Sequence, residues 1–323
     1  MKKLLNIFIN TVDDFEFNES FAAELKLIAP NAEITIASGK SEDSYALENA
    51  EIILGWINND QIAKAKNLKW LQLPSAGFDE CTDKSLYHNS DIRLTNARGI
   101  YGVSMAEHVL GLIISFNRNL HYYARFQTEK RWNPMKAGKN ILGSTVGIIG
   151  LGDIGSEVAK RMHALGAVVV AVKRSPSETP EYVNELFFGE EGIDSLVKKC
   201  DYIILTLPIT SKTKNVISEA RLKSMKPGCF IVNVGRGMLI DQEALIKALN
   251  KGWIGGAGLD VTTPEPLPSD NPLWGMYNVL ITPHASGDSA YNTEKILVIF
   301  KENLKRYIDA KPLINSIDFS AEY

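Results

Sequence analysis

The sequence predicts an α/β protein with two doubly wound domains, each built on a parallel sheet. Short β-rich runs alternate with helical patterns throughout the chain, and this alternation is typical of βα units. The length of 323 residues exceeds what one hydrophobic core usually supports, so we expect two domains.

The first third of the chain contains candidate strands separated by helical stretches. Strands are expected at Leu4–Ile9, Glu33–Ala37, Glu51–Leu54, Trp70–Leu73 and Ile92–Leu94. Helical patterns lie between them at Glu19–Ile28 and Gln61–Ala65. The opening run, Met1-Lys2-Lys3 and the apolar residues after it, imitates a signal peptide. However, Asn6 and Asn10 interrupt it and no small-residue cleavage site follows, so we interpret it as the first strand.

The stretch from Val103 to Asn117 has a different pattern, that of a long helix apolar on more than one face. Such a helix is usually buried on two sides, so we expect it between domains or subunits. A second βα series begins at Thr145. Its strands are expected at Val146–Ile149, Val168–Val172, Tyr202–Thr206, Cys229–Val234, Gly256–Asp260 and Val279–Ile281, and a last helix at Tyr291–Ile308.

Clusters of Gly, Pro and Asn mark the expected crossings between the domains, near Asn96–Gly102 and Pro283–Asp288. The first domain would comprise residues 1–100 together with 289–323. The second domain, residues 101–288, would be an insertion, and the last helix would return to the first domain.

The composition is ordinary for a soluble globular protein, and small molecules are the expected partners. The net charge is −3 and there is no basic block, which argues against nucleic acid or a membrane as partner. Cys81, Cys200 and Cys229 are widely spaced without a CxxC motif, so we expect buried thiols in a reducing, cytoplasmic compartment. The histidines show no metal-binding spacing, so no metal is expected.

A glycine motif opens the second series: Gly150-Leu151-Gly152-Asp153-Ile154-Gly155 lies between a strand and a helical pattern. In such a turn the first glycine permits the bend, the second lets a pyrophosphate approach, and the third lets helix and strand pack closely. The helix N-terminus offers N–H groups to the phosphates. A glycine-rich turn without a ligand is the plainer alternative, but the flanking strand, helix and next strand favour dinucleotide binding.

Three polar residues follow strands later in the series and should therefore lie at the same sheet edge: Arg236, Glu265 and His284. A guanidinium can hold a carboxylate with two hydrogen bonds, and histidine is a natural proton donor at neutral pH. A carboxylate on the other ring nitrogen would fix the tautomer of the histidine. Each residue alone could be an ordinary turn residue, but the three types together indicate catalysis.

Several ordered segments resemble the signature of the D-isomer-specific 2-hydroxyacid dehydrogenases. They are Met225–Gly228, Asn233–Gly237, Gly258–Val261, Glu265–Pro268 and Thr282–His284. The similarity extends upstream through Gly150–Gly155 and the Ala106-Glu107-His108 helix to the Ser75–Asp79 loop, so it covers most of the chain. The family includes glyoxylate/hydroxypyruvate reductases, D-lactate dehydrogenases and phosphoglycerate dehydrogenases.

The resemblance implies two Rossmann-like domains, a nucleotide-binding domain inserted in a flavodoxin-like substrate domain, with a cleft between them and a homodimer paired through the nucleotide domain. It implies reduction of a small 2-keto acid, such as glyoxylate or hydroxypyruvate, to the D-2-hydroxy acid. Arg236 would bind the substrate carboxylate and carbonyl, His284 would be the acid/base, and Glu265 its partner. The backbone of Ser75, Ala76 and Gly77 would also hold the carboxylate. Further cofactor contacts are implied for Ser104, Thr206, Leu207, Pro208, Val234, Asp260, Ala285, Ser286 and Gly287.

The residues after the strand expected at Val168–Val172 bear on the choice between NADP and NAD. Many family members carry an aspartate there, which accepts hydrogen bonds from the ribose 2′-hydroxyl and repels a 2′-phosphate. This chain has Lys173 and Arg174 instead, so NADP is the expected cofactor, with NAD possible. In the alternative, both cations are solvated and Glu178 or Glu181 serves the ribose.

Two other functions remain open. A dinucleotide-sensing regulatory protein of the corepressor type would share this fold, although the near-absence of tails and low-complexity segments favours an enzyme. A formate dehydrogenase-type relative would carry glutamine at the position of Glu265. The choice of substrate would depend on a few cleft residues, expected at Trp56, Ile57, Phe78, Tyr101 and Trp132.

Overall fold

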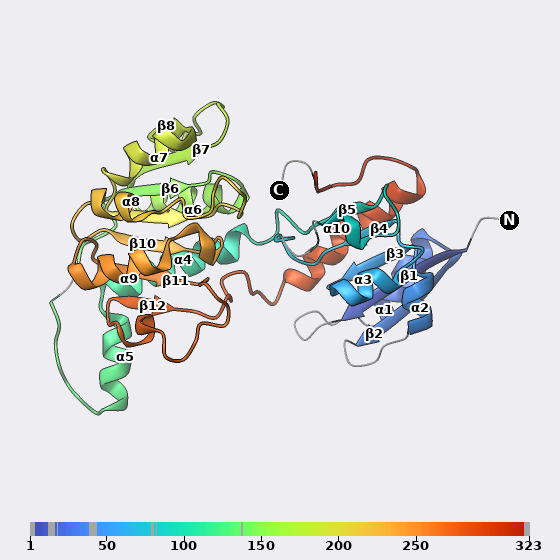
Figure 1. Cartoon of the computed structure of the whole chain (residues 1–323), viewed down its shortest axis with the longest axis horizontal. Helices are drawn as coiled ribbons and strands as arrows, with labels where there is room; N and C mark the ends of the chain where they lie inside the picture. The colour runs from blue at the N-terminus through green and yellow to red at the C-terminus, as the bar shows by residue number, and fades with distance from the viewer. Residues whose placement is uncertain are drawn as a thin grey trace. The chain divides into compact units, whose positions relative to one another are not determined.

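The computed structural model describes residues 4–11, 17, 19–38, 44–78, 81, 83–136 and 138–319. The chain divides into two compact units (Figure 1). Unit 1 comprises Met1–Ile100 and Ser289–Tyr323, and unit 2 comprises Tyr101–Asp288. Met1, Lys2, Lys3 and Asp79, which belong to segments discussed above, lie outside the described residues.

Within the described part of unit 1, five parallel strands form a sheet of order β2-β1-β3-β4-β5. This is the flavodoxin-like order. The strands are β1 (Leu5–Thr11), β2 (Ala32–Ser38), β3 (Ile52–Gly55), β4 (Trp70–Gln72) and β5 (Arg93–Thr95). Helix α1 (Glu19–Ile28) packs against α10 (Asn292–Ile308), and α2 (Ser44–Asn49) packs against α3 (Asn59–Lys64). A short 3-10 helix, η2, spans Lys84–Leu86.

A buried hydrogen-bond network fixes the C-terminal helix α10 to this sheet. Asn303 of α10 donates from Nδ2 to Oε1 of Gln72 on β4 at 3.2 Å and to the carbonyl of Ile314 at 3.0 Å. Thr95 donates to the same Gln72 oxygen and accepts from the Trp70 indole, both at 2.8 Å. Buried polar groups are stable only when paired, so this network specifies where the returning helix binds.

Among the residues described for unit 2, seven parallel strands form a sheet of order β12-β11-β10-β9-β6-β7-β8. From β8 inward this is the Rossmann order with one further strand. The strands are β6 (Thr145–Ile149), β7 (Val168–Lys173), β8 (Glu185–Phe188), β9 (Tyr202–Leu205), β10 (Phe230–Asn233), β11 (Gly256–Leu259) and β12 (Val279–Ile281). The fold class expected from the sequence, two parallel-sheet α/β domains, is therefore confirmed.

The helices of unit 2 form two groups. Helix α4 (Gly102–Asn117) packs on α6 (Asp153–Ala164) and on strands β10 and β11. Helix α8 (Glu219–Ser224) packs between α7 (Gly189–Val197) and α9 (Gln242–Lys251), and Figure 1 shows this second group in front of the sheet. Helix α5 (Leu120–Thr128) projects away from the rest of the unit (Figure 1). Two 3-10 helices, η3 (Gly237–Leu239) and η4 (Pro272–Gly275), lie in the loops.

Helix α4 buries one face against the described residues of unit 2. Met105, Ala106, Val109, Leu112 and Ile113 are buried. On the opposite side, Val103 and Ile114 are 42% and 41% exposed. Within unit 2 one face of the helix is covered, and the expected burial of a second face between domains or subunits stays a prediction.

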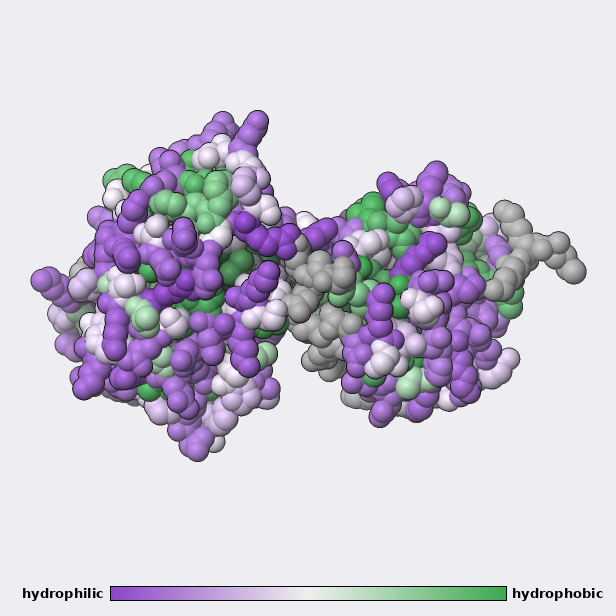
Figure 2. Space-filling view, turned by 45° about the horizontal axis from the view of Figure 1, so that its top comes forward, coloured by the Kyte–Doolittle hydropathy of each residue, from purple (hydrophilic) through white to green (hydrophobic). Residues whose placement is uncertain are grey.

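The face shown in Figure 2 is mostly hydrophilic, with small apolar areas. Cys81, Cys200 and Cys229 are all buried and none forms a disulfide, as expected. Among the described residues, no helix has the length and apolarity needed to cross a membrane.

Candidate active site

The glycine turn after β6 is shaped for close approach. Gly150 has a φ of +107°, a conformation that side-chain-bearing residues rarely adopt, and its N–H donates to the Val172 carbonyl at 3.0 Å. A Cβ at Gly155 would lie 1.9 Å from the Gly150 carbonyl oxygen, so only glycine permits this contact between helix and turn. A Cβ at Gly152 would meet no atom within 4 Å, so the turn is open at the start of α6.

This geometry fits a dinucleotide. Helix α6 begins at Asp153, and its N-cap residue, Gly152, supplies no side chain to the first N–H groups. Leu151 is buried and Ile154 is half-buried, so the turn is anchored to the unit by its apolar residues. Open space in front of a helix N-terminus suits a pyrophosphate, because aligned N–H groups and the helix dipole favour negative charge.

The end of β7 lies beside this turn, because Gly150 bonds the carbonyl of Val172. Lys173 is half-buried and its Nζ lies 3.4 Å from the Ser177 hydroxyl, while Arg174 is exposed. The structure thus places two cations next to the glycine turn. Glu178 and Glu181 are both exposed on the segment after β7.

Other predicted cofactor contacts follow the neighbouring strands or begin α4. Thr206, directly after β9, donates from Oγ1 to the Gly150 carbonyl at 2.6 Å, so it is next to the glycine turn. Leu207 also lies there, since its Cδ2 would be 3.0 Å from a Cβ at Gly150. Pro208 follows and is exposed, Val234 after β10 is buried, and Ser104 in the first turn of α4 is half-buried.

The loop after β10 holds Arg236. The side chain of Asn233 fixes this loop, because its Nδ2 donates to the Arg236 carbonyl at 2.8 Å and its Oδ1 accepts from Gly235 N at 3.1 Å. The Arg236 side chain is half-buried and its Nη1 donates to the Gly235 carbonyl at 2.8 Å. A Cβ at Gly237 would lie 1.8 Å from the Thr262 carbonyl oxygen, so this loop touches the loop that carries Glu265.

His284 and Glu265 form a hydrogen-bonded pair. The Nδ1 atom of His284 lies 2.8 Å from Oε2 of Glu265, and the other carboxylate oxygen, Oε1, accepts from Thr262 N at 3.1 Å. A carboxylate on Nδ1 places a proton there and leaves Nε2 for reaction. The His284 side chain is 51% exposed, so that nitrogen can reach a ligand.

Asp260, directly after β11, is buried, and its carboxylate accepts several hydrogen bonds from the segment that carries His284. Its carboxylate has no exposed surface. It accepts from Thr282 Oγ1 at 2.6 Å, from Ala285 N at 2.9 Å and from Ser286 N at 3.0 Å. Gly287 packs close to Tyr101, whose Cδ1 would be 3.1 Å from a Cβ at that glycine. Asp260 therefore shapes the segment on which the predicted cofactor contacts Ala285 and Gly287 lie.

Comparisons with known proteins agree with this architecture. Residues 110–286 match the family described as "D-isomer specific 2-hydroxyacid dehydrogenase, NAD binding domain". The chain is 32% identical over 261 residues to a glyoxylate reductase of Thermofilum pendens, covering 77% of this chain and 74% of that protein. The chain belongs to the D-isomer-specific 2-hydroxyacid dehydrogenase family.

Solved structures of this dehydrogenase family share the whole fold. A family protein from Aeromonas salmonicida is 32% identical, with a TM-score of 0.85, over 97% of this chain and 99% of its own. A family dehydrogenase from Xanthobacter autotrophicus, solved with NADPH and MES, is 27% identical, with a TM-score of 0.82, over 99% of this chain and 100% of its own. Membership of the family supports a nicotinamide cofactor for this dehydrogenase.

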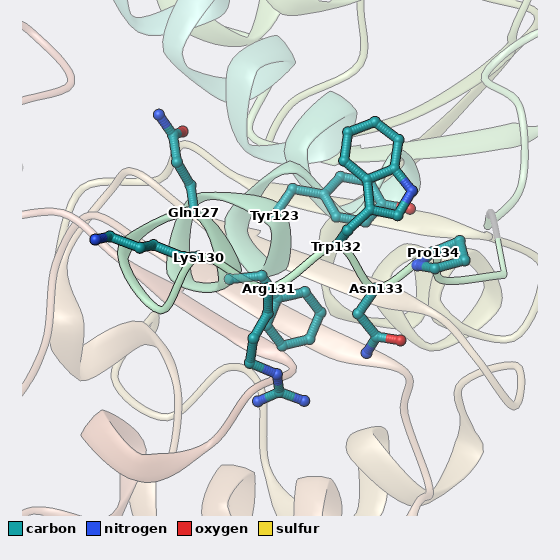
Figure 3. A pocket seen from close by; sticks show the side chains of 8 residues that line it. Tyr123, Gln127, Lys130, Arg131, Trp132, Asn133 and Pro134 are labelled. Carbon is teal, nitrogen blue, oxygen red and sulfur yellow. The ribbon is translucent and has the colours of Figure 1, made fainter.

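A pocket on unit 2 lies away from these residues. It is lined by Tyr123, Phe126, Gln127, Lys130, Arg131, Trp132, Asn133 and Pro134, on α5 and the segment after it (Figure 3). Trp132 is fully exposed, and neither His284 nor Arg236 lines this pocket. The part expected for Trp132 in selecting the substrate stays a prediction, and Tyr101 is buried beside Gly287.

Three residues with a structural part in the site had no role assigned from the sequence: Asn233, Thr282 and His108. Asn233 and Thr282 lie inside the motifs quoted above, so position next to Arg236 and His284 was the available signal. Ser75, Ala76 and Gly77 lie in unit 1, after β4, where Ser75 Oγ bonds the Gly77 carbonyl. Within the described residues no group of three or more His, Cys, Asp or Glu side chains could hold a metal ion.

Proposed function

We propose that this dehydrogenase reduces a small 2-keto acid of the glyoxylate or hydroxypyruvate type to the D-2-hydroxy acid, with NADPH as the preferred reductant. The observation that carries the proposal is the His284–Glu265 pair, joined at 2.8 Å after β12 and β11. This pair lies in the loops next to that of Arg236, because Gly237 contacts Thr262. A proton donor and a carboxylate anchor are the two groups that keto acid reduction requires.

Each catalytic residue has one role in the proposal. Arg236 binds the substrate carboxylate and orients the keto group, since a guanidinium remains charged and offers paired donors. His284 donates a proton from Nε2 to the oxygen on C2 as negative charge develops there. Glu265 holds Nδ1 and stabilises the imidazolium form. The substrate-binding assignment includes Ser75, Ala76 and Gly77 of unit 1.

The cofactor assignment rests on the turn from Gly150 to Gly155 and on the residues that follow β7, β9, β10 and β12. When bound, a reduced nicotinamide supplies the hydride that is added to C2. The open space in front of Gly152 and the start of α6 would receive the pyrophosphate. Lys173 and Arg174 would receive the adenosine 2′-phosphate, and no carboxylate stands at the end of β7 to repel it.

A homodimer is part of the proposal. Val103 and Ile114 are large apolar residues exposed on one face of α4, and covering them would favour an interface on this face. A second copy of this chain that covered this face of α4 would bury both residues. Light scattering at micromolar concentration should give twice the mass of 35.7 kDa, and a monomeric mass with full activity would contradict this assignment.

The decisive test is a turnover assay. NADPH and NADH consumption should be followed at 340 nm with glyoxylate, hydroxypyruvate, pyruvate, phenylpyruvate and a branched keto acid, and the product analysed for D-configuration. We expect turnover with at least one small keto acid and more with NADPH. NADPH binding without turnover on any of them would instead favour the dinucleotide-sensing function.

A further inference from the structure

A second histidine, His108 on α4, contacts the segment that carries His284. Its Nε2 lies 3.0 Å from Thr282 Oγ1 and 3.8 Å from Asp260 Oδ1. The His108 side chain is 22% exposed, and the Asp260 carboxylate is completely buried. Through His108, helix α4 therefore contacts both Thr282 and the buried carboxylate of Asp260.

The hydrogen bonds fix the direction of this contact. The Thr282 hydroxyl donates its single proton to Asp260 Oδ1 at 2.6 Å, because a carboxylate oxygen accepts. The Thr282 oxygen can then only accept from His108. The Nε2 atom of His108 must therefore carry a proton, and it orients the Thr282 hydroxyl toward Asp260.

Asp260 in turn holds the backbone around His284 by hydrogen bonds. Its carboxylate accepts from Ala285 N and Ser286 N, and its carbonyl accepts from His284 N at 2.8 Å. His284 has a φ of +56°, a left-handed conformation that non-glycine residues hold only when the surroundings determine it. The conformation that presents the His284 ring thus depends on Asp260 having its hydrogen bonds in place.

We propose that His108 is a positioning residue for the reaction, acting through Thr282 and Asp260 on the orientation of His284; this rests on the proposed function. His108 touches neither the substrate nor the reacting atoms. Without its N–H, the Thr282 hydroxyl is free to rotate, and the Asp260 carboxylate loses a neighbouring donor. The segment after β12 then samples other conformations, and the His284 ring is less often in line with the keto oxygen.

The test compares His108→Leu, which removes the donor, with His108→Gln, whose amide N–H can reach the same oxygen. We expect His108→Leu to lower kcat by about 30- to 100-fold, since small misplacement of a catalytic group costs about that much. The Kd for NADPH, measured by fluorescence, should rise by a smaller factor than kcat falls, because the glycine turn is intact and only the predicted contacts on the segment after β12 are disturbed. His108→Gln should recover kcat to within about threefold of wild type. The control, His163→Leu, changes an exposed histidine on α6 and should leave kcat unchanged.

A double-mutant cycle tests whether His108 acts through the Thr282 hydroxyl. Thr282→Val removes the hydroxyl and Thr282→Ser keeps it, so the valine variant should lose kcat and the serine variant should not. The pair His108→Leu/Thr282→Val should be no worse than the poorer single variant by more than about twofold, because both break the same link. If His108→Leu does not fold, the Thr282 pair and His108→Gln still test the proposal.

Three results would overturn it. They are a kcat for His108→Leu within about twofold of wild type, a His108→Gln variant no better than His108→Leu, and additive losses in the double variant. A wild-type enzyme without turnover on any keto acid would remove the proposed function and this inference with it. An active wild type with an equally active His108→Leu variant would remove only the inference.

Discussion

Glu265 holds the His284 imidazole by its Nδ1 atom at 2.8 Å, while Thr262 N holds the other oxygen of the same carboxylate at 3.1 Å. Glu265→Gln keeps the shape but removes the negative charge that stabilises the imidazolium. The alkaline limb of the kcat profile for keto acid reduction should therefore move to lower pH. We would measure kcat from pH 5 to 10.

The matched control for this variant is Glu243→Gln, an exposed carboxylate in the first turn of α9. Its pH profile should overlay that of the wild type. A Glu265→Gln profile that also overlays the wild type would mean that the hydrogen bond has no part in proton donation.

Arg236 is expected to contribute through the geometry of its guanidinium as well as its charge. Arg236→Ala should lower kcat/KM for the keto acid by about 100-fold or more, and Arg236→Lys should recover little, because an ammonium lacks the paired donors. Folding should be nearly unaffected, because the side chain is only half-buried and the carbonyl that it bonds belongs to the adjacent residue, Gly235. Near-normal kcat/KM in the alanine variant on every accepted keto acid would rule out the anchor role.

The cations after β7 should decide between the two nicotinamide cofactors. Arg174→Ala should raise KM for NADPH by about tenfold or more, because a fork-shaped cation suits a phosphate, and should change KM for NADH little. Lys198→Ala, which removes an exposed cation after α7, is the control. A wild-type kcat/KM for NADH equal to that for NADPH would contradict the assignment.

Gly155 should be intolerant of even one methyl group. In Gly155→Ala the new Cβ would lie 1.9 Å from the Gly150 carbonyl oxygen, so α6 or the glycine turn must shift. We expect the free energy of unfolding to fall by about 1–3 kcal/mol and cofactor binding to weaken in parallel. Gly143→Ala tests strain without a clash, since its φ is +74° but a Cβ there meets nothing within 4 Å; it should leave cofactor binding intact.

The thiols of unit 2 should be unreactive in the folded protein. Burial raises the pKa of Cys200 to about 12 and moves the pKa of Cys229 in the same direction. A raised pKa keeps a thiol protonated at pH 8, and the thiolate is the reactive form. A disulfide reagent should therefore titrate these thiols only after unfolding, when all 3 cysteines react. Rapid labelling of Cys200 or Cys229 in the native protein would contradict their burial.

The strands were predictable because their signal is local. Ile52, Ile53 and Leu54 are completely buried, and such continuous apolar runs indicate strands covered on both faces. Strand β8 was not predicted, and its Glu185–Phe188 sequence is only partly buried at the sheet edge. Helix α5 was also missed, and none of its residues is buried, so packing gives no signal for it.

Three predicted strands extend one residue too far, and in each case that residue belongs to the candidate site. Thr206, Val234 and Asp260 were expected to end strands, but β9, β10 and β11 stop just before them. These residues therefore lie in the loops, where ligands bind in doubly wound sheets. The hydrogen bonds of Asn233 and Asp260 could not be predicted, since they depend on side-chain directions in a folded loop. Most of their partners are backbone groups, which carry no sequence signal.

The contact between Gly237 and Thr262 limits how this enzyme could be redesigned. Arg236 and Glu265 lie on two loops whose backbones touch at Gly237 and Thr262. A Cβ at Gly237 would lie 1.8 Å from the Thr262 carbonyl oxygen, so any side chain there would clash. A library that varies residue 237 would therefore push the Glu265 loop out of place along with the Arg236 loop. Selection for new substrates is better aimed at positions away from this contact, where a larger residue can change the fit of the substrate without altering the spacing of the proposed catalytic residues.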